Sequence, residues 1–406
     1  MSLPSIDRPA PSRAGETLAA WLLRRLLSDL ESGQITIITP AGNHVVLQGR
    51  KPGEQATIVL HRWRALHRLL IGGDLGFAEA YIDGDWSSPD LLGLLDLVTH
   101  NAEAVDCKLR GMLPVRLVHR LRHLLNANTP RGSRRNISFH YDLGNAFYAL
   151  WLDPQMIYSS ALYRDARETL EQAQEAKLDR IVELLSPAEG DAILEIGCGW
   201  GALALRLAQR RARVTGLTLS TEQLAWARDR ARHSDAAERC AFELKDYRKA
   251  AGRFDRIVSI EMLEAVGERF WPTYFDKLRE LLAPHGTAVI QVITIDEKRF
   301  EHYRRHSDFI QRHVFPGGML PTGAAIAREA AAAGFEVVGR ETFGDSYART
   351  LEEWRRRFLR AWPTIQHLGV DLPFRRLWDY YLCYCAAGFR AGAIDVGLYT
   401  LRPKAA

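Results

Sequence analysis

The sequence predicts an α/β protein in which a parallel sheet is covered by helices on both faces and follows a small α+β domain. The chain has 406 residues, more than a single hydrophobic core usually holds, so two domains are expected. In the second half, short apolar runs alternate with amphipathic segments, which is typical of a parallel sheet with helices on both sides. Three short apolar runs near the beginning indicate a small antiparallel sheet.

The elements can be placed in order along the chain. In the first domain we expect strands at 34–39, 44–49 and 56–61, and helices at 62–72, 75–82 and 89–101. In the second domain a helix at 167–186 precedes strands at 192–197, 213–218, 240–246, 256–261, 287–294 and 335–341. Helices between these strands are expected at 201–210, 221–233, 269–283 and 324–333. The predicted organisation is a flexible tail (1–16), the small α+β domain (17–105), a basic helix and linker (106–136) and the second domain (137–406).

The formal charge of +5 is concentrated in one segment, because no acidic residue lies between Asp106 and Asp142. The cations of this segment are Lys108, Arg110, Arg116, Arg120, Arg122, Arg131, Arg134 and Arg135. Over 108–127, Leu and Val alternate with Arg and His, which predicts a helix with one apolar and one cationic face. Such a segment suits an anionic surface, either phospholipid headgroups or nucleic acid. A solvated linker or a packed connecting helix is the alternative interpretation.

The cysteines and the first residues favour a cytoplasmic protein. The five cysteines form no CxxC pattern and no metal-site spacing, so we expect no metal and a reducing compartment. The first 16 residues lack the apolar core of a signal peptide, and no run of 18 apolar residues exists.

A glycine turn follows the first strand of the second domain in EIGCGWG (195–201). Gly197, Gly199 and Gly201 allow a tight turn and a close approach of the backbone to a ligand. Glu195 lies inside the strand, and the spacing is ExGxGxG rather than the GxGxxG of dinucleotide-binding turns. This arrangement resembles motif I of class I S-adenosylmethionine methyltransferases.

The next two strands also end in polar residues. The second ends at Thr218, and Gln223 on the following helix is the nearest candidate to bind the ribose of the cofactor. The third ends before Asp246 and Tyr247, an acid–aromatic pair that could bond to and stack on adenine. Polar residues at three successive strand ends, where ligands of parallel sheets bind, predict an S-adenosylmethionine site.

Longer motifs resemble the cyclopropane-fatty-acyl-phospholipid synthase family over 137–395. The motifs are NISFHYDLGNAFYALWLDPQMIYSSALY (136–163), LEIGCGWG (194–201), GLTLSTEQ (216–223), KDYR (245–248), SIEMLEAVGERFWPTYF (259–275), FPGGMLP (315–321), FGDSYARTLEEWRRRF (343–358) and YYLCYCAAGFRAG (380–392). GDLGFAEAYIDGDW (73–86) resembles the end of the N-terminal domain of longer members. The resemblance implies a Rossmann-like class I methyltransferase sheet. It also implies methyl transfer from S-adenosylmethionine to the double bond of unsaturated acyl chains in membrane phospholipids, through a carbocation.

The resemblance also assigns residues. In the family a bound bicarbonate, held by a Cys, a Glu, a His, a Tyr and the backbone of an Ile, is the base. These positions are Ser160, Glu264, Gln291, Tyr347 and Ile293 in this sequence. Tyr158 and Ser159 match positions beside the methionine part of the cofactor, while Gly197, Gly199, Gln223, Asp246 and Tyr247 match other cofactor positions.

Two of these positions depart from the family pattern, since Ser160 replaces Cys and Gln291 replaces His. Both can donate hydrogen bonds to an anion, but neither supplies the positive charge of a protonated His. The departures therefore put the ring-closing loss of a proton in doubt. A cyclopropane is one product, and a methylene-branched chain, which a separate reductase would turn into a methyl-branched chain, is the other. EMLEAVG (261–267) is closer to relatives that make branched products.

A nucleic-acid methyltransferase is disfavoured because the chain has no Pro-Pro pair and no nucleic-acid-binding module. A lipid- or cofactor-binding protein without catalysis is disfavoured by the intact glycine turn and Glu264. Glu261 is expected to pair with an Arg or cap a helix, and Trp354, Phe358 and Trp362 are expected in the core. The expected partner is the inner surface of the phospholipid bilayer, and a homodimer is allowed by the sequence.

Overall fold

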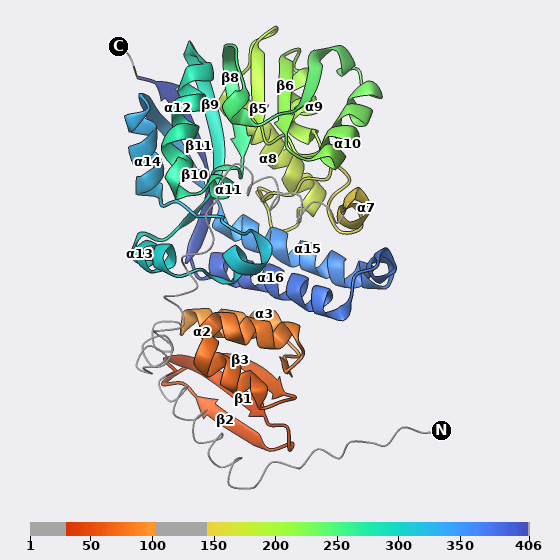
Figure 1. Ribbon diagram of the computed structural model, residues 1–406, viewed down its shortest axis with the longest axis vertical. Coiled ribbons are helices and arrows are strands. Elements are labelled where there is room, and N and C mark those ends of the chain that lie inside the picture. The colour runs from red at the N-terminus through yellow and green to blue at the C-terminus, as the bar shows by residue number, and fades with distance from the viewer. Residues whose placement is uncertain (1–29, 102–143, 405–406) are drawn as a thin grey trace. The chain divides into compact units, whose positions relative to one another are not determined.

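The computed structural model describes residues 30–101 and 144–404 (Figure 1). The chain divides into two compact units between His119 and Arg120. The predictions for the tail (1–16) and for the basic helix and linker (106–136) lie outside the described residues.

The first unit contains a four-stranded sheet in the order β2-β1-β3-β4. Its strands are β1 (Ser32–Ile38), β2 (His44–Gln48), β3 (Lys51–Leu60) and β4 (Trp86–Ser87). The expectation of an antiparallel sheet is wrong for one pair, because β1 and β3 run parallel. After β2 the chain passes close to the backbone at the start of β1. A Cβ atom added at Gly49 would lie 2.8 Å from the carbonyl carbon of Ser32, and one added at Gly53 would lie 2.8 Å from the backbone nitrogen of Gly33. Glycines permit this close crossing, which a strand pattern alone does not reveal.

Two helices complete the first unit. Helix α2 (Arg64–Ile82) covers both helices expected at 62–72 and 75–82, and it is interrupted at Gly73, whose φ is 59°. Helix α3 (Leu91–His100) begins after Asp90, whose side chain accepts a hydrogen bond from Gly93 N at 3.0 Å. An acid that caps a helix start in this way is a common N-terminal signal.

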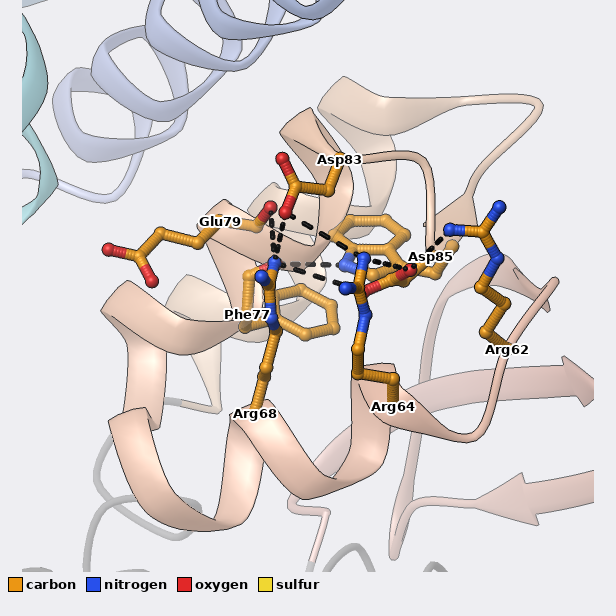
Figure 2. Close-up of polar contacts among 8 residues, drawn as sticks. Arg62, Arg64, Arg68, Phe77, Glu79, Asp83 and Asp85 are labelled. Carbon is orange, nitrogen blue, oxygen red and sulfur yellow. Dashed lines mark hydrogen bonds and ion pairs between the residues drawn. The ribbon is translucent and has the colours of Figure 1, made fainter.

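The sequence DGDW (83–86) forms an ion-pair network that joins the two ends of α2 (Figure 2). The Asp85 side chain is fully buried and accepts hydrogen bonds from Arg64 Nε at 2.8 Å and from Arg62 Nη1 at 3.4 Å. Arg68 pairs with Asp83 at 2.7 Å. A buried carboxylate is tolerated here because several guanidinium groups surround it.

The second unit contains a seven-stranded sheet in the order β10-β11-β9-β8-β5-β6-β7. Its strands are β5 (Ala192–Ile196), β6 (Arg213–Thr218), β7 (Cys240–Leu244), β8 (Phe254–Ile260), β9 (Leu282–Ile295), β10 (Phe335–Thr342) and β11 (Ile394–Pro403). The five strands β5 to β9 are parallel, as predicted. Strand β11, which was not predicted, lies antiparallel between β9 and β10.

Helices cover both faces of this sheet (Figure 1). Two neighbouring residues of β5 belong to different hydrophobic cores, one on each face of the sheet. Leu194 packs in the core formed with α12 (Trp271–Leu281) and α14 (Gly323–Ala332). Ile193 packs in the core formed with α8 (Leu170–Leu185), α9 (Ala202–Gln209) and α10 (Thr221–Arg232). Because both faces of the sheet pack against helices, both sides of each central strand are apolar, and the sequence of these strands is a continuous apolar run.

The remaining helices of the second unit are α7 (Gly144–Ala149), α11 (Leu263–Val266), α13 (Glu297–Arg305), α15 (Gly344–Ile365) and α16 (Leu372–Arg390). Figure 1 shows α15 and α16 as a helix pair across the end of the sheet at which α11 begins. That end is the carboxyl end of β8, where a ligand of a parallel sheet is expected.

Candidate active site

The site begins at the glycine turn between β5 and α9. All three glycines have positive φ: 79° at Gly197, 51° at Gly199 and 85° at Gly201. A Cβ at Gly197 would lie 2.5 Å from the Met262 side chain, and one at Gly201 would lie 3.0 Å from the Phe242 ring. A Cβ at Gly199 would meet nothing within 4 Å. Packing therefore requires two of the glycines, whereas the backbone of Gly199 stays bare toward open space, as a closely bound cofactor needs.

Thr218 and Gln223 lie together where β6 ends. The Thr218 hydroxyl donates to Gln223 Oε1 at 2.9 Å and accepts from Ser220 N at 3.1 Å. Thr218 thereby fixes the orientation of the Gln223 amide, whose NH₂ group is the part suited to bind a ribose hydroxyl.

Asp246 and Tyr247 lie where β7 ends, with contacts that the sequence did not predict. Arg248 Nε donates to Asp246 Oδ1 at 2.9 Å. The Tyr247 ring packs edge-on against Tyr274 with centroids 5.6 Å apart, and burial raises the pKa of Tyr247 to about 12. The expected contact of this pair with adenine stays a prediction.

The segment before α8 carries Tyr158, Ser159 and Ser160 to the carboxyl end of the sheet. The Tyr158 hydroxyl lies 3.0 Å from the Tyr381 hydroxyl. Ser159 Oγ accepts a hydrogen bond from Lys177 Nζ at 2.7 Å. Ser160 N donates to Glu261 Oε1 at 2.9 Å, whereas the Ser160 hydroxyl donates to the carbonyl of the next residue. At this position, where the family has Cys, Ser160 therefore binds Glu261 through its backbone N–H and not through its side chain.

Lys177 is a candidate that the sequence analysis missed. Lys177 is 1% exposed. Burial lowers the pKa of its ammonium group to about 8, and the negative charges of nearby carboxylates, among them Glu261 and Glu195, oppose this decrease. A detectable signal was present, because Lys177 lies between Ala173 and Ile181 on the buried side of α8. A lysine on an apolar stripe is costly unless polar groups face it.

Glu195 is the last residue but one of β5, a strand that lies between β6 and β8. Burial raises its pKa to about 8, partly offset by the charge of Lys177. Within the described residues its Oε2 atom is buried without a hydrogen-bond partner. A buried acceptor of this kind at a ligand-binding edge fits a group that a cofactor would contact.

Glu261 is the centre of the hydrogen-bond network at the end of β8. Its Oε1 accepts from Ser160 N at 2.9 Å and from Gln291 Nε2 at 2.7 Å, and its Oε2 accepts from the Tyr347 hydroxyl at 2.7 Å. Within the part of the chain that the structure describes, Glu261 pairs with no arginine and caps no helix, so the expectation for Glu261 is wrong there. Burial raises the pKa of Glu261, while these donors and Lys177 oppose the rise.

Glu264 lies one turn further on, in α11. Its Oε1 accepts a hydrogen bond from Ile293 N, so two of the positions that the family resemblance assigns to bicarbonate bind each other. Its Oε2 is buried and, among the described residues, has no partner. Burial and then the charge of Glu261 raise the pKa of Glu264 to about 8. One of two neighbouring carboxyl groups is therefore held protonated at neutral pH.

An aromatic cluster adjoins this carboxylate pair through Tyr347, which donates a hydrogen bond to Glu261. Tyr347 packs edge-on against Trp354, with centroids 6.2 Å apart, and Trp354 packs against Tyr158 at 5.3 Å and Trp151 at 5.8 Å. Trp354 and Phe358 are fully buried, which confirms the core interpretation, whereas Trp362 is only partly buried. Aromatic faces beside carboxylates can stabilise a cation.

Among residues 30–101 and 144–404, no cluster of three or more His, Cys, Asp or Glu is arranged to hold a metal ion. In the same ranges, none of the helices is both long enough and apolar enough to span a membrane.

The fold and the site together define a class I methyltransferase. All strands of the sheet run in the same direction except β11, a glycine turn follows β5, and polar groups gather at the carboxyl ends of β5, β6 and β8. The open space above Gly199 and the unpartnered Glu195 Oε2 fit a bound S-adenosylmethionine.

Comparison with known proteins identifies the family. Residues 128–398 match the family model described as mycolic acid cyclopropane synthetase. The tuberculostearic acid methyltransferase UfaA1 of Mycobacterium tuberculosis is 37% identical over 98% of this chain and 93% of its own. The cyclopropane-fatty-acyl-phospholipid synthase of Escherichia coli K12 is 36% identical over 81% of this chain and 83% of its own. The crystal structure of the mycolic acid cyclopropane synthase CmaA1 with SAH and CTAB has 31% identity and a TM-score of 0.62, covering 66% of this chain and 97% of that one.

The chain therefore belongs to the mycolic acid cyclopropane synthetase family. It is an S-adenosylmethionine-dependent methyltransferase of that family.

Proposed function

We propose that this enzyme methylates a carbon of the double bond in unsaturated acyl chains of membrane phospholipids, and that the product is methylene-branched rather than a cyclopropane. The observation that carries the proposal is the pair Glu261–Glu264 at the end of β8, beside the aromatic shell of Tyr347 and Trp354. Relatives of similar identity are named for both outcomes, a tuberculostearic acid methyltransferase and a cyclopropane synthase.

S-adenosylmethionine supplies an electrophilic methyl group. The π electrons of the alkene form the new bond to this methyl carbon, and a cation is left on the other alkene carbon. The ring of Tyr347, whose hydroxyl is bonded to Glu261, is the aromatic group that would shield that cation, and a carboxylate at the end of β8 would stabilise it by charge. Fixed charges and ring faces stabilise a developing cation better than water does, because they need not reorganise.

The fate of the cation decides the product. If a proton leaves the new methyl group while its electron pair closes a bond to the cationic carbon, a cyclopropane forms. If a hydride first shifts so that the branch carbon becomes cationic, loss of a proton from the methyl group gives an exocyclic methylene. The second product is favoured by Gln291, which replaces the cationic His of the ring-forming members with a neutral amide. A separate reductase would then convert the methylene into a methyl branch.

The test is the structure of the lipid product. The protein is incubated with labelled S-adenosylmethionine and vesicles of a monounsaturated phospholipid, and the acyl chains are analysed by NMR. We expect exocyclic methylene protons and uptake of one molecule of hydrogen on catalytic hydrogenation. Cyclopropyl protons would exclude the branched product but keep the methyl transfer, whereas unlabelled lipid would refute the proposed substrate class.

A further inference from the structure

We propose that the carboxylate of Glu261 is the proton acceptor of the reaction and takes the place of the bicarbonate implied by the family resemblance, so that turnover requires no added bicarbonate. This inference rests on the proposed function and extends it to the identity of the base.

The groups expected around bicarbonate are already bound to Glu261. Of the five assigned positions, Ser160, Gln291 and Tyr347 donate hydrogen bonds to its two oxygens, at distances of 2.9, 2.7 and 2.7 Å. A fourth, Ile293 N, donates to the fifth, Glu264. A carboxylate and a bicarbonate present the same planar pair of oxygens and the same charge. Because the donors are already engaged, a second anion would have to enter beside Glu261 without them and against its charge.

The backbone at this position is shaped for the task. Glu261 has a φ of 50°, a left-handed conformation that is strained for a non-glycine residue. The strand hydrogen bond from Glu261 N to Gln291 O at 2.8 Å holds this conformation, and the side chain turns back to the same residue, Gln291, and to Tyr347. Strain of this kind is found where function requires a side chain in a particular place.

The departures at Ser160 and Gln291 follow from the same arrangement. A free anion must be attracted and retained, and a protonated His serves that purpose. A carboxylate attached to the chain needs orientation only, and the neutral Gln291 amide provides it through Nε2. The Cys position loses its role because the backbone N–H of Ser160 makes the contact.

The protonation states of the pair suit this assignment. Glu261 accepts three hydrogen bonds, which favour its ionised form, whereas Glu264 accepts one from Ile293 and is raised to a pKa of about 8 by burial and by the charge of Glu261. Of the two carboxyl groups, Glu261 is therefore the one whose ionised form is favoured by its hydrogen-bond donors.

The proposed step is balanced. After the hydride shift, a Glu261 oxygen takes a proton from the methyl carbon, the electron pair of that C–H bond becomes the second bond between this carbon and the cationic branch carbon, and Glu261 is left as a neutral acid. The proton returns to water when the product leaves. A general base contributes about 10²- to 10⁴-fold to a rate.

The experiment measures labelled methyl transfer to monounsaturated phospholipid vesicles in buffer freed of carbon dioxide, with and without added bicarbonate. We expect the unaltered protein to react equally fast in both buffers. Glu261→Gln keeps the size of the side chain and one acceptor oxygen but cannot take up a proton, so its turnover should fall at least 100-fold while its affinity for S-adenosylhomocysteine changes less than threefold. Glu268→Gln, which alters an exposed ion pair with Arg304, is the matched control and should retain the normal rate.

A third variant tests replacement of the anion directly. Glu261→Gly removes the carboxylate, and glycine accepts the positive φ without strain. This variant should be inactive without bicarbonate and regain activity as bicarbonate is added, to a plateau. A dependence of the unaltered protein on bicarbonate, or a Glu261→Gln variant within threefold of the normal rate, would overturn the inference. Absence of any methyl transfer by the unaltered protein would instead refute the proposed function.

Discussion

Replacing Gly199 by alanine tests whether its bare backbone lies against the cofactor. A non-glycine residue with φ near +51° costs about 1–2 kcal/mol, because Cβ approaches the following carbonyl oxygen. No other cost to folding is expected, since the new Cβ meets nothing within 4 Å. In the complex, however, the methyl group would occupy the space needed by the cofactor, so the affinity should fall at least tenfold, or about 1.4 kcal/mol.

Gly190 provides a matched control. It lies in the exposed turn before β5, its φ is 84°, and a Cβ there also meets nothing within 4 Å. Gly190→Ala should therefore lower the melting temperature by a similar few degrees without changing cofactor affinity. Calorimetric titration with S-adenosylhomocysteine and thermal unfolding measure the two effects separately. The reasoning is refuted if Gly199→Ala binds within threefold of the unaltered protein, or if both variants lose affinity equally.

Three further predictions concern buried charges. Lys177→Met should move the acidic limb of the pH–rate profile to higher pH, because the ammonium group helps to lower the pKa of Glu261; an unmoved limb would contradict this role. Between pH 4.5 and 8 the unaltered protein should lose at most about 1.4 kcal/mol of its free energy of unfolding per pH unit, because folded Glu264 keeps a proton that the unfolded chain releases. Glu264→Gln should abolish this loss, and urea unfolding that gives parallel curves of stability against pH for the two proteins would argue against it. Asp85→Asn should destabilise the first unit by about 2 kcal/mol, since charged hydrogen bonds are lost at a fully buried side chain, whereas Asp83→Asn at the partly exposed partner should cost less than about 1 kcal/mol in the same thermal unfolding measurement.

The fold was largely predictable because its signals are local. Apolar runs identified β5 to β10, and the glycine turn marked the first of them. Strand β11 was missed because it returns from the far end of the chain and inserts between β9 and β10, a long-range pairing without a local signal. The parallel pairing of β1 and β3 was missed for a similar reason, since it depends on the chain crossing at Gly49.

The site was predictable only as far as the motifs extend. The family positions led to Glu264, Tyr347 and Ile293, and the structure joins the first and last of these by a hydrogen bond. Glu261 was misjudged because its role depends on a left-handed backbone at the strand end, which turns its side chain toward Tyr347 rather than to solvent. Hydrophobic periodicity reveals which face of a helix is buried, but the polar atoms that satisfy Lys177 there come from another segment.

The hydrogen bonds that hold Glu261 also affect how the anion position is kept occupied. A dissolved anion occupies its site in proportion to its concentration, and bicarbonate rises and falls with carbon dioxide and with pH. A carboxylate attached to the chain has a fixed local concentration, which for well-oriented groups corresponds to effective molarities of about 10⁵–10⁸ M. Occupancy of this position is therefore set when the protein folds and does not vary with the gas exchange of the cell.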